Sequence, residues 1–432
     1  MKRFAFPLVF VICQVLTACG VAPASQPRGE ATSQSAEIAT LVSNHLTNAV
    51  PSATPAQAAS GVSVTQAAPV APAGLKVVYS QAGNLALWNG SSTKQLTASG
   101  TDTQPRISQD GQVVVFLRGD KLWAVDASGS GERRLAAMPL VDGEQVIPFH
   151  MGFAPHSHDL YFSTTSKGEG GWGGSYDDLI RINADKPVLQ QLLIQSQGGD
   201  EFTFSPDGKQ IALAREDKID VFQVDGNLLK TVFTFPVVFI GSDRKGYIPQ
   251  AVWMSDSSGF MTVIPAPDAI ANPAATSRFM FVPADGSQAA QLAAFSATAD
   301  IGDGPRISPD GTQVLYLKII GDKLELHIVD ASTADRAHGQ FPATDIGTLQ
   351  WAPDSVHFSY SLAGTVGFNA WVGSQAGPAA SLGWADQMTW VDANHFLFME
   401  NDNLGLETLS QTGLLIASGV DRSWDFSLTP NP

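Results

Sequence analysis

Short apolar runs recur along the chain, and tight polar turns separate them. The clearest turns have serine first, aspartate third and glycine fourth, and they lie at residues 108–111, 205–208 and 308–311. Two of them carry proline second, which presets φ for a type I turn, and the glycine can take positive φ as the next strand begins. An apolar run follows each turn, at residues 112–117, 210–213 and 313–317. The pattern predicts repeated units of strand, turn and strand.

A large apolar residue precedes each turn and returns at a regular spacing. Weaker copies of the turn follow Phe153, Trp253, Trp351 and Trp390. The seven markers, at positions 107, 153, 204, 253, 307, 351 and 390, are 46, 51, 49, 54, 44 and 39 residues apart. This is the period of a four-stranded propeller blade. Runs such as residues 113–117 are apolar at successive positions, as expected when blades stack and cover both faces of a strand.

The two ends of the repeat region complement each other. Residues 421–427 resemble the innermost strand of a further unit, and the chain ends before its partners. Residues 75–80, 84–88 and 94–97 look like three strands that lack an inner one. Pairing the C-terminal strand with the N-terminal strands would close the ring. The sequence therefore predicts an all-β propeller of four-stranded blades over residues 75–432, with eight blades favoured and seven as the alternative if the 39-residue unit merges with a neighbour.

The repeat resembles that of a known family. The Ser-Pro-Asp-Gly turns, the strands at residues 121–126 and 323–330, and Gln95-Leu96-Thr97 are similar to the WD-like repeat of TolB-type β-propellers. The resemblance covers the chain from Leu75 to its C-terminus. It implies a propeller fold but selects no function, because that repeat serves periplasmic scaffolds and the gating propellers of peptidases alike.

The N-terminus has the features of an export signal. Lys2 and Arg3 precede an apolar stretch at residues 4–16, followed by Leu16-Thr17-Ala18-Cys19. This tetrapeptide resembles the lipobox of bacterial lipoproteins, which implies a signal peptide at residues 1–18 and a lipid anchor on Cys19; the alternative is an ordinary signal with a coincidental cysteine. Gly20 follows where some sorting rules look for aspartate, so the outer membrane is expected if the host has two membranes. The protein is expected to be exported and attached to the cell envelope.

Residues 19–74 are predicted to be a flexible linker. Ala, Pro, Ser, Thr and Gln dominate this stretch, and it has few aromatic residues. The chain has only two cysteines, Cys13 and Cys19, and Cys13 would leave with the signal. No internal disulfide is then possible, so stability has to come from the packing of the blades and the closure of the ring.

The formal charge of the chain is −16, and removal of Lys2 and Arg3 with the acid-free signal would leave −18. Nucleic-acid binding needs clustered Lys and Arg, so this charge argues against it. Cations or basic protein segments are the favoured partners.

Acidic residues precede nearly every predicted inner strand. Loops that join blades share one face of a propeller with the loops between second and third strands, so these acids would surround the mouth of the channel. They are Asp102, Asp142, Asp200, Asp303, Asp345, Asp386 and Asp421. One interpretation is a negative funnel for a cation or a basic peptide. The other is that the aspartates cap turns, which short acidic side chains do well.

One glycine-rich loop on the same face, residues 168–178, carries Trp172, Tyr176, Asp177 and Asp178. Aromatic residues on loops are typical of protein and carbohydrate recognition. The loop lacks the lysine and the following helix of a phosphate-binding loop. The alternative is a surface insertion with Trp172 folded back on its blade.

Motifs for catalysis are not found in the sequence. It has no G-x-S-x-G elbow, and no cofactor motif, so no cofactor is expected. His150, His156 and His158 are close in sequence, but His156 and His158 occupy a strand-linking turn, and we interpret them as turn residues and not metal ligands.

The sequence therefore predicts a monomeric, lipid-anchored propeller that serves as a binding scaffold in the bacterial envelope, with an envelope protein, a basic peptide segment or a glycan as partner. The alternatives are a propeller enzyme, a glycan lyase or hydrolase using the acids at the channel mouth, and an outer-membrane assembly lipoprotein.

Overall fold

The structure of the whole chain is a computed structural model. The structure describes residues 70–137, 140–141, 144–166, 178–186, 190–194, 201–240, 245–266, 275–296, 304–342, 346–363, 368–410 and 413–429. All of the described residues belong to one compact unit, residues 66–432. The predicted signal peptide, Cys19 and most of the predicted linker lie outside the described residues. Within the described residues no helix is long and apolar enough to span a membrane.

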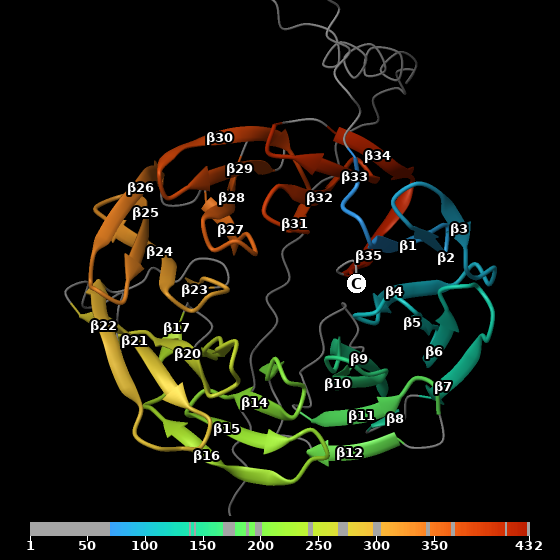
Figure 1. Cartoon of the computed structure of the whole chain (residues 1–432), viewed down its shortest axis with the longest axis horizontal. Coiled ribbons are helices and arrows are strands. Elements are labelled where there is room, and N and C mark those ends of the chain that lie inside the picture. The colour runs from blue at the N-terminus through green and yellow to red at the C-terminus, as the bar shows by residue number, and fades with distance from the viewer. Residues whose placement is uncertain are drawn as a thin grey trace, which may run out of the picture. The chain divides into compact units, whose positions relative to one another are not determined.

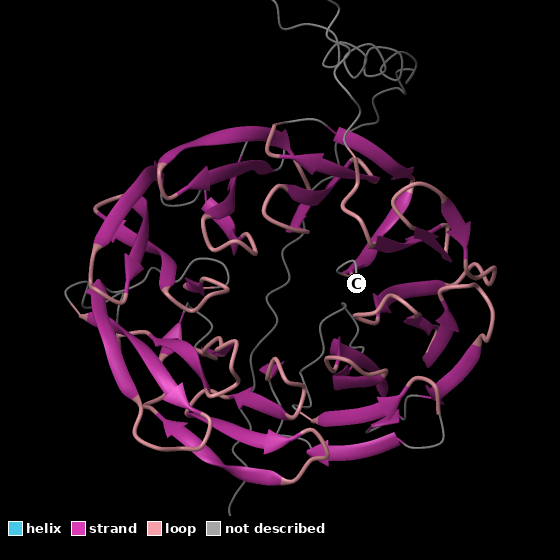
Figure 2. Cartoon of the chain, viewed as in Figure 1, coloured by secondary structure: helices cyan, strands magenta, loops and turns pink. Residues whose placement is uncertain are grey.

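Every regular element among the described residues is a strand, and all strands but β17 and β18 belong to eight blade sheets around a central axis (Figures 1 and 2). Blade 1 contains β4 (Asp102–Ile107), β5 (Val113–Arg118), β6 (Lys121–Asp126) and β7 (Arg133–Ala137). Blade 2 contains β8 (Leu140–Val141), β9 (Glu144–Phe153), β10 (Asp159–Ser166), β11 (Leu179–Asn183) and β12 (Gln190–Ile194). Blade 3 contains β13 (Glu201–Phe204), β14 (Gln210–Ala214), β15 (Lys218–Gln223) and β16 (Leu228–Thr234).

The other half of the ring has the same design. Blade 4 contains β19 (Val252–Trp253), β20 (Gly259–Ile264), β21 (Thr276–Pro283) and β22 (Ala290–Ser296). Blade 5 contains β23 (Arg306–Ile307), β24 (Gln313–Ile320), β25 (Lys323–Asp330) and β26 (Asp335–Pro342). Blade 6 contains β27 (Ile346–Trp351), β28 (His357–Ala363), β29 (Phe368–Ser374) and β30 (Gly377–Trp384). Blade 7 contains β31 (Gln387–Trp390), β32 (His395–Glu400), β33 (Asn403–Thr408) and β34 (Gly413–Ser418).

The eighth, closing blade joins the two ends of the chain. It pairs β35 (Val420–Leu428) with β1 (Leu75–Gln81), which continues to β2 (Asn84–Trp88) and β3 (Thr93–Gln95). The antiparallel register sets Leu75 opposite Leu428 and Val77 opposite Phe426. The predicted closure and the count of eight blades are therefore confirmed. The 39-residue unit, whose merger with a neighbour would have given seven blades, forms the complete four-stranded blade 6.

Two elements were not predicted. Blade 2 has a fifth strand, because the two-residue β8 pairs with the long β9 at the inner edge of the sheet. A separate hairpin, β17 (Phe239–Ile240) with β18 (Lys245–Gly246), lies between blades 3 and 4 in sequence.

The repeated turn is explained by its serine. In blade 5 the buried Ser308 hydroxyl donates to Asp310 Oδ1 at 2.6 Å and accepts from the backbone N–H groups of Thr312 and Gln313 at 3.2 and 3.0 Å. Gly311 has a φ of +73°, which a residue with a side chain rarely adopts. Ser108 and Ser205 bind their turns in the same way. One buried hydroxyl thus satisfies backbone groups where the strand ladder has to turn.

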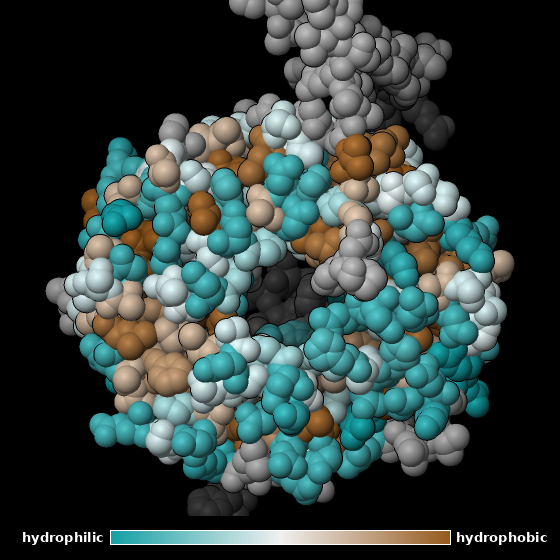
Figure 3. Space-filling model, in the orientation of Figure 1, coloured by the Kyte–Doolittle hydropathy of each residue, from teal (hydrophilic) through white to brown (hydrophobic). Residues whose placement is uncertain are grey.

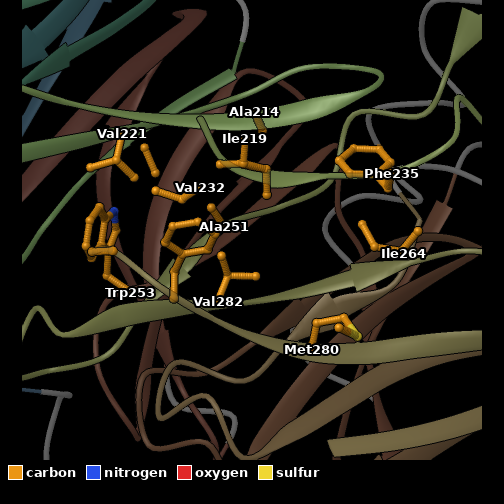
Figure 4. Close-up of a cluster of buried hydrophobic side chains, with 13 residues drawn as sticks. Ala214, Ile219, Val221, Val232, Phe235, Ala251, Trp253, Ile264, Met280 and Val282 are labelled. Atoms are coloured by element: carbon orange, nitrogen blue, oxygen red, sulfur yellow. The ribbon is translucent and has the colours of Figure 1, made fainter. Parts of the chain in front are cut away.

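The hydrophobic core is divided among the blade interfaces. Eight clusters of buried side chains are present, one between each pair of adjacent blades. Figure 4 shows the cluster between blades 3 and 4, where Val221 and Ile219 face Trp253 and Val282. Each sheet is covered on both faces, so the blades stabilise one another and a single blade would leave both apolar faces in water.

Candidate functional site

The face that carries the loops between blades is called the crossover face, and the opposite face, which carries the Ser-x-Asp-Gly turns, is called the turn face. The structure describes four of the acids predicted on the crossover face, Asp102, Asp178, Asp386 and Asp421. Seven other predicted site residues lie outside the described residues: Asp142, Trp172, Tyr176, Asp177, Asp200, Asp303 and Asp345.

Asp102 is completely buried at the start of β4. Its carboxylate accepts two hydrogen bonds from Arg118, at 2.6 and 3.1 Å, and Arg118 also binds Glu132. Burial alone would raise the pKa of Asp102, but the hydrogen bonds from Arg118 and nearby hydroxyls outweigh it and hold the pKa below its ordinary value. The Asp102 carboxylate is therefore bound by Arg118 of the same blade and does not face the channel as a free acid.

Asp421 and Asp178 accept hydrogen bonds from backbone N–H groups of neighbouring strands and turns. Asp421 accepts hydrogen bonds from the N–H groups of Ala82 and Gly83 and from the Ser80 hydroxyl, at 3.2, 2.8 and 2.8 Å, and so ties β35 to the β1–β2 turn. Asp178 accepts from the Thr164 N–H and hydroxyl at 2.7 and 2.8 Å. These contacts match the capping interpretation of the acids. The negative funnel, which needs the acids that lie outside the described residues, stays a prediction.

Asp386 is placed differently, because it lines a cavity. Its carboxylate accepts a hydrogen bond from Arg422 at 3.1 Å, and Arg422 also contacts Asp402 at 3.2 Å. The cavity has a volume of about 420 Å³ and lies between blades 6 and 7. Its lining includes Thr348, Gln350, Phe368, Asp386, Gln387 and Thr389. Of the predicted acids that are described, Asp386 is thus the one found in a cavity.

This cavity continues along the channel wall. A second cavity of about 540 Å³ shares Thr348, Gln350 and Thr389 with the first. A third, of about 440 Å³, shares Gln250 and Arg306 with the second. Together they form a groove along the inner strands from blade 3 to blade 7, called the channel groove below. Figure 3 shows the central hollow of the ring.

The groove residues follow a simple rule that the sequence-based interpretation missed. In blades 6 and 7, residues one and three positions before the marker tryptophan line the groove: Gln350 and Thr348 precede Trp351, and Thr389 and Gln387 precede Trp390. Alternate residues of a strand share a face, so this period of two was readable in the sequence. Phe368 had no such signal, because it belongs to β29 and reaches the cavity only through the packing of the sheet.

Two of the three charged residues among the described lining residues, Glu201 and Arg306, lie away from blades 6 and 7. Glu201 lines the groove at blade 3 and is paired with His150 of blade 2, Nδ1 to Oε1, at 3.0 Å. Arg306 of blade 5 donates from Nε to the Leu349 carbonyl at 3.3 Å. At blades 6 and 7 the only charged residue among the described lining residues is Asp386.

The turn face contains a histidine cluster. His158 lies 2.8 Å from Asp185 through Nδ1 and 3.1 Å from Asp110 through Nε2, and so bridges blades 1 and 2. Burial lowers its pKa, but the two carboxylates outweigh burial and raise the pKa above its ordinary value. His156 occupies a turn position with a φ of +56°. Among the described residues no group of three or more His, Cys, Asp or Glu side chains could hold a metal ion.

Comparison with known proteins bears on the fold. No family model matches the chain, and no curated protein is found to be related to it. A eukaryotic initiation factor structure is similar at a TM-score of 0.50 and 11% identity, over 82% of this chain and 99% of that one. TolB from Acinetobacter baumannii is similar at a TM-score of 0.31 and 15% identity, over 62% of this chain and 63% of that one. An oligogalacturonate lyase in complex with manganese is similar at a TM-score of 0.47 and 12% identity, over 74% of this chain and 91% of that one.

Peptidases are also among the similar structures, and the chain spans 59% of the length of a puromycin hydrolase and 51% of a prolyl endopeptidase. At these identities the comparisons support the propeller fold alone. They do not choose between a scaffold and an enzyme.

Proposed function

We propose that the protein is a binding scaffold of the bacterial cell envelope, exported, anchored through a lipid on Cys19, and engaging its partner at the channel groove. The observation that carries the binding role is the groove itself. Its described lining comes mainly from the inner strands of blades 3 to 7 and the segments that lead into them, so the side chains that meet a partner are held by the sheets. Sites on rigid elements bind without a large cost in ordering.

The contacts of the two carboxylates in the groove, Glu201 and Asp386, favour a binding role over acid–base chemistry. The two that line the described groove both have a side-chain partner: Glu201 lies 3.0 Å from His150 Nδ1, and Asp386 lies 3.1 Å from Arg422. A general acid and base pair needs carboxyl groups within reach of a substrate proton. Both carboxylates are held by their partners in the described part of the groove, which favours a role in organising the wall.

The anchor is supported by the sequence Leu16-Thr17-Ala18-Cys19 behind a short apolar stretch. Fractionation of cells tests it, with the wild-type chain beside Cys19→Ala. The wild-type chain is expected in the membrane fraction and the variant in the soluble fraction. Equal distribution of the two chains would refute the anchor without touching the binding role.

Affinity purification from crosslinked envelopes tests the binding role. Thr348→Trp places a bulky side chain in the groove, and Ala376→Trp places the same side chain on the turn face of the same blade. The first variant is expected to lose the captured partner and the second to retain it. Partner capture that survives Thr348→Trp and is lost with Ala376→Trp would place binding on the turn face and refute the proposal.

A further inference from the structure

Among the described residues, the interface between blades 6 and 7 has the smallest cluster of buried apolar side chains. The cluster contains four buried residues, Ala352, Val372, Trp390 and Phe396, whereas each of the other described clusters has at least six. The 420 Å³ cavity with Asp386 lies at this interface, toward the crossover face. Its volume falls within the usual range for small-ligand sites, about 300–1,000 Å³.

An aromatic ring is exposed in this cavity. Phe368 lies at the start of β29 and is 48% exposed, although burial of its ring would be worth about 2 kcal/mol. Gly347 is the reason why the ring stays open. A Cβ at residue 347 would meet the Ser361 hydroxyl at 2.5 Å and a Phe368 ring carbon at 3.6 Å, so any larger residue would enter the space beside the ring.

The polar groups around the ring are uncharged and available. Thr348, Gln350, Ser361 and Thr389 make no side-chain hydrogen bond within the described part of the chain. An amide offers donors and an acceptor, and a hydroxyl offers both, so the cavity presents mixed neutral hydrogen bonding. The carboxylate of Asp386 is in contact with Arg422, which it shares with Asp402.

We propose that this cavity binds a neutral sugar residue, with the Phe368 ring beneath the C–H face of the sugar and the Gln350, Thr348 and Thr389 side chains at its hydroxyls. A sugar ring has an apolar face and a rim of hydroxyl groups, which is the chemistry that the lining complements. No Lys or Arg is among the described lining residues, so phosphate and carboxylate groups find no counter-charge. A purely apolar ligand would leave four polar side chains unsatisfied.

This inference deepens the proposed function, since it names the ligand class of one part of the channel groove. Titration of the full-length chain tests it with neutral trisaccharides, namely maltotriose, cellotriose and chitotriose. Trigalacturonic acid serves as the charged probe of equal length, and trialanine as the peptide probe. At least one neutral trisaccharide is expected to bind and to be preferred about tenfold or more over both other probes.

Two matched pairs of variants locate the binding. Phe368→Ala removes the ring, and Leu415→Ala removes an apolar side chain that is 62% exposed on blade 7. Gly347→Val fills the cavity, and Gly377→Val adds the same bulk on the turn face of blade 6, where a Cβ meets nothing closer than 3.6 Å. The first member of each pair is expected to raise the Kd of the trisaccharide about tenfold or more, and the second less than about twofold.

The proposal is overturned if no neutral trisaccharide binds, if trialanine or the acidic probe binds better, or if Phe368→Ala and Gly347→Val leave the Kd unchanged. Partner capture from envelopes separates this from the proposed function. Capture that persists while the trisaccharides fail refutes only the sugar, whereas loss of capture with Thr348→Trp supports the groove whatever its ligand.

Discussion

Trp351 donates a hydrogen bond from its indole Nε1 to the backbone carbonyl of Arg306, 2.9 Å away, and thereby joins the inner strand of blade 6 to that of blade 5. Trp253 makes the equivalent contact to Thr203 O of blade 3 at 3.3 Å, and Trp390 reaches the Ser359 hydroxyl of blade 6 at 3.0 Å. The three marker tryptophans therefore do more than fill the core. Each fixes the position of its blade against the blade before it.

Replacement of Trp351 by phenylalanine tests this contact. The variant keeps most of the apolar contact but leaves the Arg306 carbonyl without the indole donor, at a cost of about 1–3 kcal/mol in the free energy of unfolding. Urea denaturation measures it. The matched control is Trp123→Phe, because the buried Trp123 Nε1 has no partner in the described part of the chain and its loss removes no hydrogen bond. Equal destabilisation by both changes would contradict the account.

The serine of the repeated turn gives a second prediction. Ser308→Ala removes the acceptor of two backbone N–H groups and the donor to Asp310. The Gln313 N–H loses its acceptor, whereas the Thr312 N–H keeps a hydrogen bond to Asp310 Oδ1 at 3.0 Å, so we expect the free energy of unfolding to fall by about 1–2 kcal/mol. Ser332→Ala, in an exposed turn of the same blade, should cost less than about 0.5 kcal/mol. Two equal values would mean that the buried hydroxyl has no special role.

The contact of His158 with two carboxylates predicts a dependence of stability on pH. The pKa of His158 is raised in the folded chain from an ordinary value of 6.5, so its contribution is fully present below pH 6.5 and is lost as pH rises through the folded value. The difference in unfolding free energy between wild type and His158→Gln should be about 1 kcal/mol at pH 6 and should shrink toward pH 9. A difference that grows with pH would have the wrong sign.

Glu407 of β33 provides a pH prediction for blade 7. Burial and, to a smaller extent, Glu400 raise its pKa to about 7 from 4.5. Because the folded pKa is the higher one, the chain loses stability as pH rises from 4.5 through 7. The side chain is partly exposed, so we expect Glu407→Gln to stabilise by roughly 1–2 kcal/mol at pH 8 and to change nothing at pH 4. Thermal unfolding at the two values checks this, and equal effects at both would contradict it.

The fold was predictable because its signal is local and repeated. The Ser-x-Asp-Gly turn, the marker residue and the apolar run recur at the length of a blade, and the unpaired strands at both ends required the closure seen between β1 and β35. The β17–β18 hairpin escaped prediction because its two-residue strands carry no periodic pattern.

The site was less predictable than the fold. Aspartates in loops often accept hydrogen bonds from neighbouring backbone N–H groups, and Asp178 and Asp421 do so here. Asp102 forms a salt bridge with Arg118 of the same blade. The cavity depends on Gly347 and Phe368, which come together across β27 and β29, and it lies beside the small apolar cluster between blades 6 and 7. Such a void arises from packing in three dimensions, and no spacing in the sequence reports it.

The most direct test of the binding role is photo-crosslinking in living cells. A benzoylphenylalanine at position 348 lies in the channel groove, and one at position 376 lies on the turn face of the same blade. The account predicts that position 348 yields a discrete crosslinked species and position 376 does not. Crosslinking from position 376 alone, or from both positions equally, would contradict binding at the groove.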